Sequence, residues 1–263
     1  MNVLIFSDLE GVPEIYSIDE LEYPSENYKL AMEKHTRWLN ITADACFNEG
    51  ADKVYFIDGH AGPTRCNIIY DILDERLIET SFDEWHNLVK SGEVDCIIEY
   101  GSHARSGTFG GFLDHTTNSR LIFSHKVGGR EFSELALHAV YAGKYDVPTV
   151  LCIGDEAACN QAKEYIPEIA TAAVKLAKER NTCSPIGNSE EIIRAGVKDA
   201  FRRLSEIKPM KTSFPCEVTL TLYRTDYLED ILKKYKGPYE RRDARTLAKI
   251  IDNLDDYENL YFR

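Results

Sequence analysis

Two carboxylates, Asp8 and Glu10, follow the apolar run VLIFS at 3–7 and stand two positions apart. Side chains two apart on an extended chain point to the same side, so both carboxylates can reach one point. Buried carboxylates are costly unless a cation or hydrogen-bond donors compensate them. We therefore expect Asp8 and Glu10 to converge on a bound cation.

Three histidines follow further apolar runs and could supply the remaining ligands. His60 stands in the segment DGH, His103 in GSHAR and His115 in DH. Oxygen and imidazole ligands without thiolates suit zinc, manganese or iron in a hydrolytic site. A carboxylate that bridges two ions, flanked by another carboxylate and imidazoles, is typical of a two-metal hydrolase. Taken singly each signal is weak, because a lone histidine is more often a structural hydrogen-bonding group and Asp58 beside Gly59 favours a turn.

The elements that must position these residues are apolar strands separated by amphipathic helices. Strand-like runs lie at 2–8, 53–60, 94–103 and 147–155, helical patterns at 26–49, 133–143 and 155–165, and a hairpin or turn region at 120–132. Near-continuous apolar strands alternating with helices indicate an α/β domain whose mainly parallel sheet is flanked by helices. Such sheets bind ligands beyond the carboxyl ends of their strands, which is where the carboxylates and histidines follow.

The pattern changes after residue 185. The later segments include a helix at 190–205, the alternating strand CEVTLTLY at 216–223 and a final helix around 244–254. We expect a metal-binding catalytic α/β domain over 1–185 and a smaller α+β part over 186–257. The last six residues, ENLYFR at 258–263, differ at one position from a common engineered protease-site linker and are set aside as a remnant of one.

Composition limits the compartment and the partners. The chain carries 44 acidic and 31 basic residues, a net charge of −13, and such a surface repels nucleic acids and anionic membranes. No apolar segment has the length of a signal sequence or a membrane span. The seven cysteines are odd in number and form no C-x-x-C, which is typical of reduced thiols. We therefore expect a cytoplasmic protein without nucleic-acid or membrane partners.

Taken in order, the motifs resemble those of the M55 family of metallopeptidases, to which D-aminopeptidases belong. The matching segments are SDLEG at 7–11, DGH at 58–60, GSHAR at 101–105, DH at 114–115, GREFSELALHAVYAGKYDVP at 129–148, GD at 154–155 and TAAVK at 171–175. The resemblance covers most of residues 1–180 and continues more weakly to about 255. It implies an aminopeptidase with two zinc ions per chain, assembled as two stacked pentameric rings, a homodecamer; manganese or iron could replace zinc.

The resemblance also implies a role for each ligand. Asp8 would bridge both ions, Glu10 and His103 would complete one site, and His60 and Glu134 the other. Only the resemblance points to Glu134, since a carboxylate in the first turn of a helix is otherwise read as an offset to the helix dipole.

His115 matches the family's catalytic histidine, and the residues alone leave open whether it acts as nucleophile, proton donor or stabiliser of the intermediate. The chain departs from the family pattern at Asp114 and Gly59, where serine is usual. We expect the loop 106–119 and the segment 62–66 to form the substrate pocket, with Phe109 and Phe112 facing an apolar group and Asp114 pairing with a substrate cation.

Three other functions remain open. A metal-dependent amidohydrolase acting on a small non-peptide amide or related C–N bond would use the same metals with a different pocket. A non-catalytic metal-binding protein of the same fold has no reason to keep both the ligand set and His115. A phosphoesterase would need basic residues near the metals, and Arg105 is the one candidate nearby. The motifs of serine hydrolases, P-loop proteins and HExxH zinc proteases are absent.

Overall fold

Two sheets organise the chain in the computed structural model, which describes residues 1–61, 65–235, 237–255 and 257–261. The larger sheet has seven strands in the order β3-β2-β1-β4-β7-β8-β9. Their bounds are Leu77–Glu79, Lys53–Asp58, Asn2–Ser7, Cys96–Ser102, Thr149–Asp155, Ala170–Glu179 and Thr182–Pro185. Neighbouring strands pair in parallel except β9, which runs antiparallel to β8.

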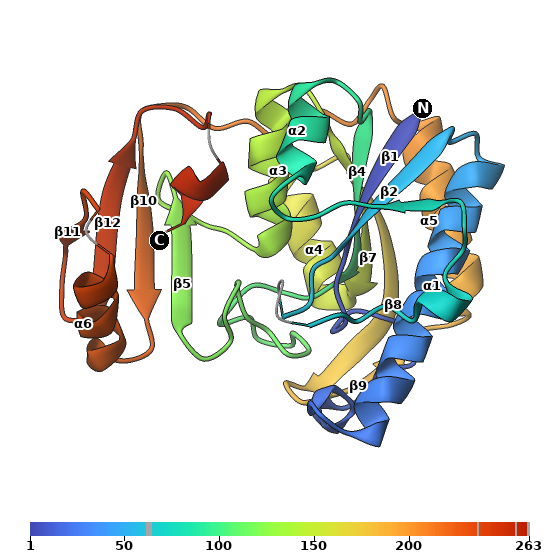
Figure 1. Cartoon of the computed structure of the whole chain (residues 1–263), viewed down its shortest axis with the longest axis horizontal. Coiled ribbons are helices and arrows are strands. Elements are labelled where there is room, and N and C mark those ends of the chain that lie inside the picture. Colours follow the sequence, from blue (N-terminus) through green and yellow to red (C-terminus); the bar gives the residue numbers. More distant parts are fainter. Residues whose placement is uncertain (62–64, 236, 256, 262–263) are drawn as a thin grey trace.

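Helices cover both faces of this sheet (Figure 1). One face carries α1 (Glu26–Asn48) and α5 (Ser189–Arg202), and the other carries α2 (Trp85–Lys90), α3 (Glu134–Lys144) and α4 (Glu156–Tyr165). The seven residues of β4 and the seven of β7 are all buried, as expected for parallel strands covered on two sides. The predicted α/β class with a mainly parallel sheet flanked by helices is confirmed.

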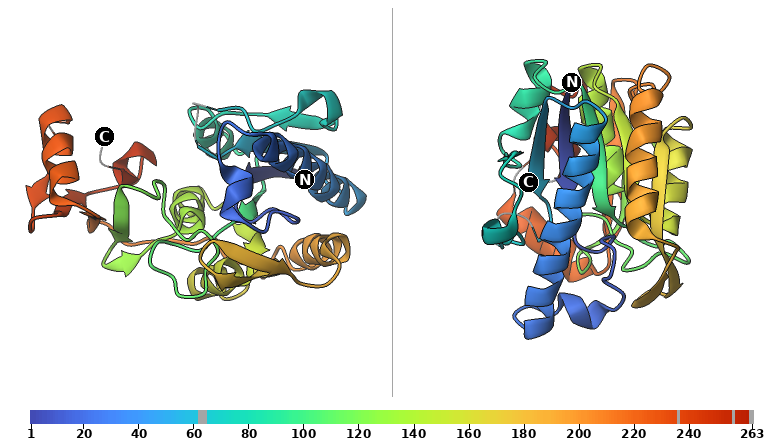
Figure 2. Two further views of the ribbon diagram at one scale, coloured as in Figure 1. Left: turned by 90° about the horizontal axis from the view of Figure 1, so that it is seen from below. Right: turned by 90° about the vertical axis from the view of Figure 1, so that its right-hand side faces the viewer.

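The second sheet is antiparallel, in the order β11-β12-β10-β5-β6. Its strands are Glu240–Arg241, Thr246–Ile251, Cys216–Leu222, Ile122–Val127 and Arg130–Glu131, with α6 at Thr225–Lys234. The pair β5 and β6 is the hairpin expected over 120–132. Because this hairpin enters from the middle of the chain, the second sheet joins segments far apart in sequence, and it lies to one side of the larger sheet (Figure 2).

The expectation of a final helix around 244–254 is wrong. Strand β12 occupies this segment and pairs with β10 along six residue pairs. Thr246, Ile250 and Ile251 are β-branched, and Leu247 and Ile251 are buried in the strand. The hydrophobic pattern of this segment fits either a helix or a strand, and the pairing with β10 favours the strand.

Helix α5 packs against β8 and β7 of the larger sheet, although it follows residue 185. Leu260 is fully buried, and its carbonyl accepts a hydrogen bond from His125 Nε2. The division at 185/186 stays a prediction. Short 3₁₀ turns lie at Ile18–Leu21, Tyr70–Ile72 and Tyr257–Leu260. Within the described ranges no helix combines the length and the apolar character needed to cross a membrane.

Candidate metal centre

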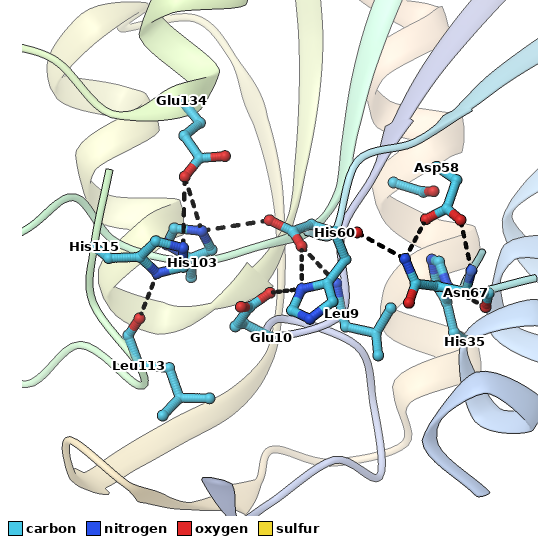
Figure 3. A network of polar contacts seen from close by, with 12 residues as sticks. Leu9, Glu10, His35, Asp58, His60, Asn67, His103, Leu113, His115 and Glu134 are labelled. Carbon is cyan, nitrogen blue, oxygen red and sulfur yellow. Dashed lines mark hydrogen bonds and ion pairs between the residues drawn. The ribbon is translucent and has the colours of Figure 1, made fainter. Parts of the chain in front are cut away.

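The predicted ligands gather where three neighbouring parallel strands end. Asp8 follows β1, His60 lies two residues beyond β2, and His103 follows β4 directly. Glu134 opens α3, whose first turn points at the same edge, and Ser133 caps that helix by accepting from the Ala136 amide. Figure 3 shows Glu10, His60, His103 and Glu134 converging from these separate elements.

Two glycines allow the β1 and β4 ends to touch. A Cβ on Gly101, which has a φ of +74°, would lie 1.8 Å from the Asp8 carbonyl oxygen, and one on Gly11 would lie 2.2 Å from the Ser102 carbonyl oxygen. Backbone hydrogen bonds from Gly11 to Gly101 (2.7 Å) and from Asp8 to Tyr100 (2.9 Å) hold the two segments together. Only glycine fits these positions, because any side chain would meet backbone atoms.

The Asp8 carboxylate lies between two imidazoles and offers one oxygen to each. Its Oδ1 is 3.1 Å from His60 Nδ1, and its Oδ2 is 3.4 Å from His103 Nε2. His60 Nδ1 also lies 3.0 Å from Glu10 Oε2, and His103 Nε2 lies 3.4 Å from Glu134 Oε1. A carboxylate with a separate partner on each oxygen has the geometry that bridging two cations requires.

Backbone carbonyls fix which nitrogen of His103 and His115 faces the centre. His103 Nδ1 donates to the Ala104 carbonyl at 3.0 Å, and His115 Nδ1 donates to the Leu113 carbonyl at 2.9 Å. Because a carbonyl can only accept, Nδ1 of each ring carries a proton, so Nε2 is the nitrogen that can bind a metal ion once it holds no proton of its own.

His115 reaches the centre from the loop between β4 and β5. Its ring stacks on that of His103 with centroids 4.0 Å apart and planes 9° from parallel. Its Nε2 lies 3.8 Å from Glu134 Oε1. The backbone amide of His115 donates to the Ala104 carbonyl at 3.1 Å, which ties this loop to the residue after His103. His115 is therefore held at the same point as the predicted ligands.

The donor atoms fit divalent ions of the kind predicted. Ligand atoms of Asp8, Glu10 and His103 lie within 4.8 Å of one another, and so do those of His103, His115 and Glu134. Both groups offer carboxylate oxygen and imidazole nitrogen, the donors that suit zinc, manganese or iron. The resemblance pairs His60 with Glu134, whereas His60 here contacts Asp8 and Glu10. How the ligands divide between two ions stays a prediction.

The predicted ligands shift one another's pKa values. Burial by itself would raise the pKa of Asp8, but hydrogen bonds with His103 and His60 outweigh it and hold that pKa well below its usual range. Burial opposes the shift at Glu134 too, where the charge of His103 lowers the pKa to about 2.

The two imidazoles shift in the opposite direction. Burial would lower the pKa of His60 and of His103, but the charges of Glu10 and Glu134, respectively, raise both well above the usual value. Without a cation these imidazoles take up protons, which an incoming metal ion must displace.

Two buried side chains that the sequence reasoning did not select support the ligand loops. Asn67 Nδ2 donates to Asp58 Oδ1 at 2.9 Å and to the His60 carbonyl at 2.7 Å, and its backbone amide donates to Asp58 Oδ2 at 2.6 Å (Figure 3). Asp58 thus closes the turn that presents His60, in line with the turn favoured at Asp58-Gly59. Lys175 Nζ donates to the Glu10 and Ile15 carbonyls at 2.9 and 2.6 Å. It lies in the TAAVK motif, but nothing in the sequence links it to Glu10.

The expected roles of the pocket loop need correction. The Asp114 carboxylate accepts hydrogen bonds from the Gly107 and Thr108 amides and pairs with Arg180 Nε at 2.9 Å, so it braces the loop and is not free for a substrate cation. Phe112 is fully buried in a small apolar cluster, while Phe109 is fully exposed. Of the segment 62–66, residues 62–64 lie outside the described residues.

Arg105, the basic residue expected near the metals, interacts elsewhere. Its Nη1 lies 3.8 Å from Glu164 Oε2, and its backbone amide donates to Gln161. Glu164 lies on α4 and is not among the predicted ligands. The geometry thus gives no support to a phosphoesterase.

Comparisons with known proteins identify the family and the fold of the chain. The sequence model of the peptidase M55 family, described as D-aminopeptidase, matches residues 1–260. The D-aminopeptidase of Bacillus subtilis (strain 168) is 26% identical over 218 residues, which cover 80% of this chain and 77% of that protein. The structure of "Zn-dependent D-aminopeptidase DppA from Bacillus subtilis, a self-compartmentalizing protease" matches with a TM-score of 0.89 at 21% identity, over 99% of this chain and 95% of that one.

The family match spans nearly the whole chain, so it confirms both the resemblance inferred from the motifs and the prediction of a metal-dependent hydrolase. The solved structure adds that the fold is shared from end to end. The chain belongs to the peptidase M55 family of D-aminopeptidases.

Proposed function

We propose that the chain is a dinuclear zinc aminopeptidase that hydrolyses small peptides or aminoacyl amides with a free amino end. The observation that carries this is the Asp8 carboxylate, which offers one oxygen toward His60 and the other toward His103. The similar solved structure is described as Zn-dependent, which favours zinc over manganese or iron. We propose Asp8, Glu10, His60, His103 and Glu134 as the metal ligands.

When bound, two zinc ions would supply a water of pKa about 7 and polarise the scissile carbonyl. The chain's own contribution is to place a proton-transferring group beside them. His115 Nδ1 is held by the Leu113 carbonyl, so its Nε2 is the atom that accepts or donates a proton. Glu134 Oε1, 3.8 Å away, would stabilise the ring when it is protonated.

A screen of substrates tests this function. Metal-loaded protein would be assayed with D- and L-aminoacyl amides, dipeptides and non-peptide amides. We expect turnover of the first two classes and none of folded proteins. Turnover confined to non-peptide amides would replace the aminopeptidase by the amidohydrolase, and no turnover of any compound would favour the non-catalytic metal-binding protein.

We further propose that the chain forms stacked pentameric rings, a homodecamer, in the cytoplasm. The self-compartmentalizing description of the similar structure supports an assembly. Light scattering on the purified protein would test it, with a mass about ten times that of the 30.0 kDa chain expected and a monomer contradicting it.

A further inference from the structure

A small cavity adjoins the metal centre and has no role in the proposed chemistry so far. Its volume is about 30 Å³, roughly room for two water-sized groups. Metal ligands Asp8, His103 and Glu134 line it, together with Glu99 and His138. Apolar side chains complete much of the wall, among them Phe6, Phe82 and Leu135. The cavity therefore joins the reacting centre to a second polar pair.

That pair is a buried carboxyl group and a buried imidazole. Glu99, in the middle of β4, is 4% exposed, and His138, on α3 one turn after Glu134, is 6% exposed. His138 Nδ1 donates to Glu99 Oε1 at 3.0 Å. The His138 ring stacks on Phe6 with centroids 3.9 Å apart and planes 9° from parallel, which fixes its orientation.

A buried carboxyl–imidazole pair is not needed to stabilise the core. Moving a carboxylate and an imidazole out of water is costly, and well-packed apolar residues often serve a core equally well. Phe6, Trp85 and Phe82 surround His138 with aromatic rings, so the setting is otherwise apolar. A buried polar pair bordering a cavity next to a reactive centre is a candidate for substrate recognition.

The proposed function requires one group that the metal ligands do not supply. A substrate with a free amino end brings a positive charge, which needs an acceptor beside the scissile bond. Of the three carboxyl groups that line the cavity in the described part of the chain, Asp8 and Glu134 are predicted metal ligands. Glu99 is the third, and it is the carboxyl group in the cavity that can bind the substrate.

Resting on the proposed function, we propose that Glu99 binds the free amino group of the substrate inside this cavity, and that His138 is the positioning residue that orients its carboxyl group. The cavity has room for an amino group and little more, so the first side chain lies outside it. Glu99 thereby selects compounds with a free, positively charged amino end over acylated or des-amino ones.

The test compares Glu99→Gln with the wild type on two substrates that differ only in the amino group, alanine p-nitroanilide and propionyl p-nitroanilide. We expect KM for the alanine compound to rise about 10- to 100-fold, as for loss of a charged hydrogen bond, with kcat little changed. KM for the propionyl compound should not change. His138→Gln should also raise KM for the alanine compound relative to KM for the propionyl compound, by a smaller factor than Glu99→Gln.

Controls separate recognition from folding. Glu93→Gln removes a half-exposed carboxyl group that accepts from Lys53 and Tyr55 before β4 begins, and it should leave both KM values unchanged. Circular dichroism and metal content would confirm that each variant is folded and loaded. An equal change of KM for both substrates, or no change for either, would overturn the assignment of Glu99.

A second measurement covers the remaining outcomes. If Glu99→Gln does not fold, competitive inhibition of the wild type decides: ethylammonium should inhibit at least 10-fold more strongly than ethanol, and equal inhibition would overturn the proposal. If the wild type cleaves neither substrate, the substrate screen described above decides the proposed function separately. Calorimetry with alaninamide then tests Glu99, with binding at least 10-fold tighter in the wild type than in Glu99→Gln expected and equal binding contradicting it.

Discussion

Replacing Asn67 by alanine should both destabilise the fold and weaken metal binding at His60. Asn67 is fully buried, and its side chain donates to Asp58 and to the His60 carbonyl and accepts from the Tyr28 hydroxyl. Each net hydrogen bond contributes about 1 kcal/mol, and a buried partner left unsatisfied costs more. Three such bonds give a loss of roughly 3–4 kcal/mol in the free energy of unfolding.

The assay is urea unfolding of metal-free protein, so that ligand binding does not add to the measured stability. Asn48→Ala is the matched control, because Asn48 is exposed and its side chain donates to Asp44 on the same helix; its effect should stay within about 0.5 kcal/mol. In a separate titration, Asn67→Ala should lower zinc affinity about 10- to 100-fold, as loss of support for a ligand usually does. A loss below about 1 kcal/mol with unchanged zinc affinity would refute the reasoning.

The remaining predictions concern catalysis and pH. His115→Ala should keep fold and metals and lose about 10²- to 10⁴-fold in kcat, as is typical of a general acid–base group; near wild-type turnover, or loss of a metal, would contradict its role. Burial lowers the pKa of His35 and of His125 to about 4, so both stay neutral in the folded protein near neutral pH. The unfolded chain takes up these protons first, so the contribution of His35 and His125 to stability should be complete above pH about 6.5 and should fall as the pH drops toward 4, by on the order of 1–3 kcal/mol per histidine. Urea unfolding of metal-free protein across this range measures how the free energy of unfolding changes with pH. Replacing either histidine by asparagine should reduce this slope. An unchanged slope would contradict the claim that these histidines stay neutral in the folded protein.

Much of the site could be predicted because it follows from sheet topology. Asp8, His60 and His103 each end an apolar strand, and parallel strands bring their carboxyl ends to one edge. Glu134 could not be found in this way, since a carboxylate that opens a helix is common without any ligand. It required the family resemblance.

Other features depend on contacts between distant segments. Lys175 reaches the Glu10 carbonyl across 165 positions, and Glu99 meets His138 across 39. The order of neighbouring residues in the sequence does not predict such pairs. The segment around 244–254 shows the same limit, because pairing with β10 makes it a strand. Asp114 was expected to face a substrate, yet neighbouring amides and Arg180 already occupy its oxygens.

The central claim is that Asp8 bridges two metal ions, and metal content measures it most directly. Elemental analysis of protein purified without chelators should give two divalent ions per chain, most of them zinc. Asp8→Ala should retain neither, because its single carboxylate serves both sites, while circular dichroism shows the fold intact. Fully loaded wild type with at most one ion per chain, or Asp8→Ala that still holds two, would contradict it.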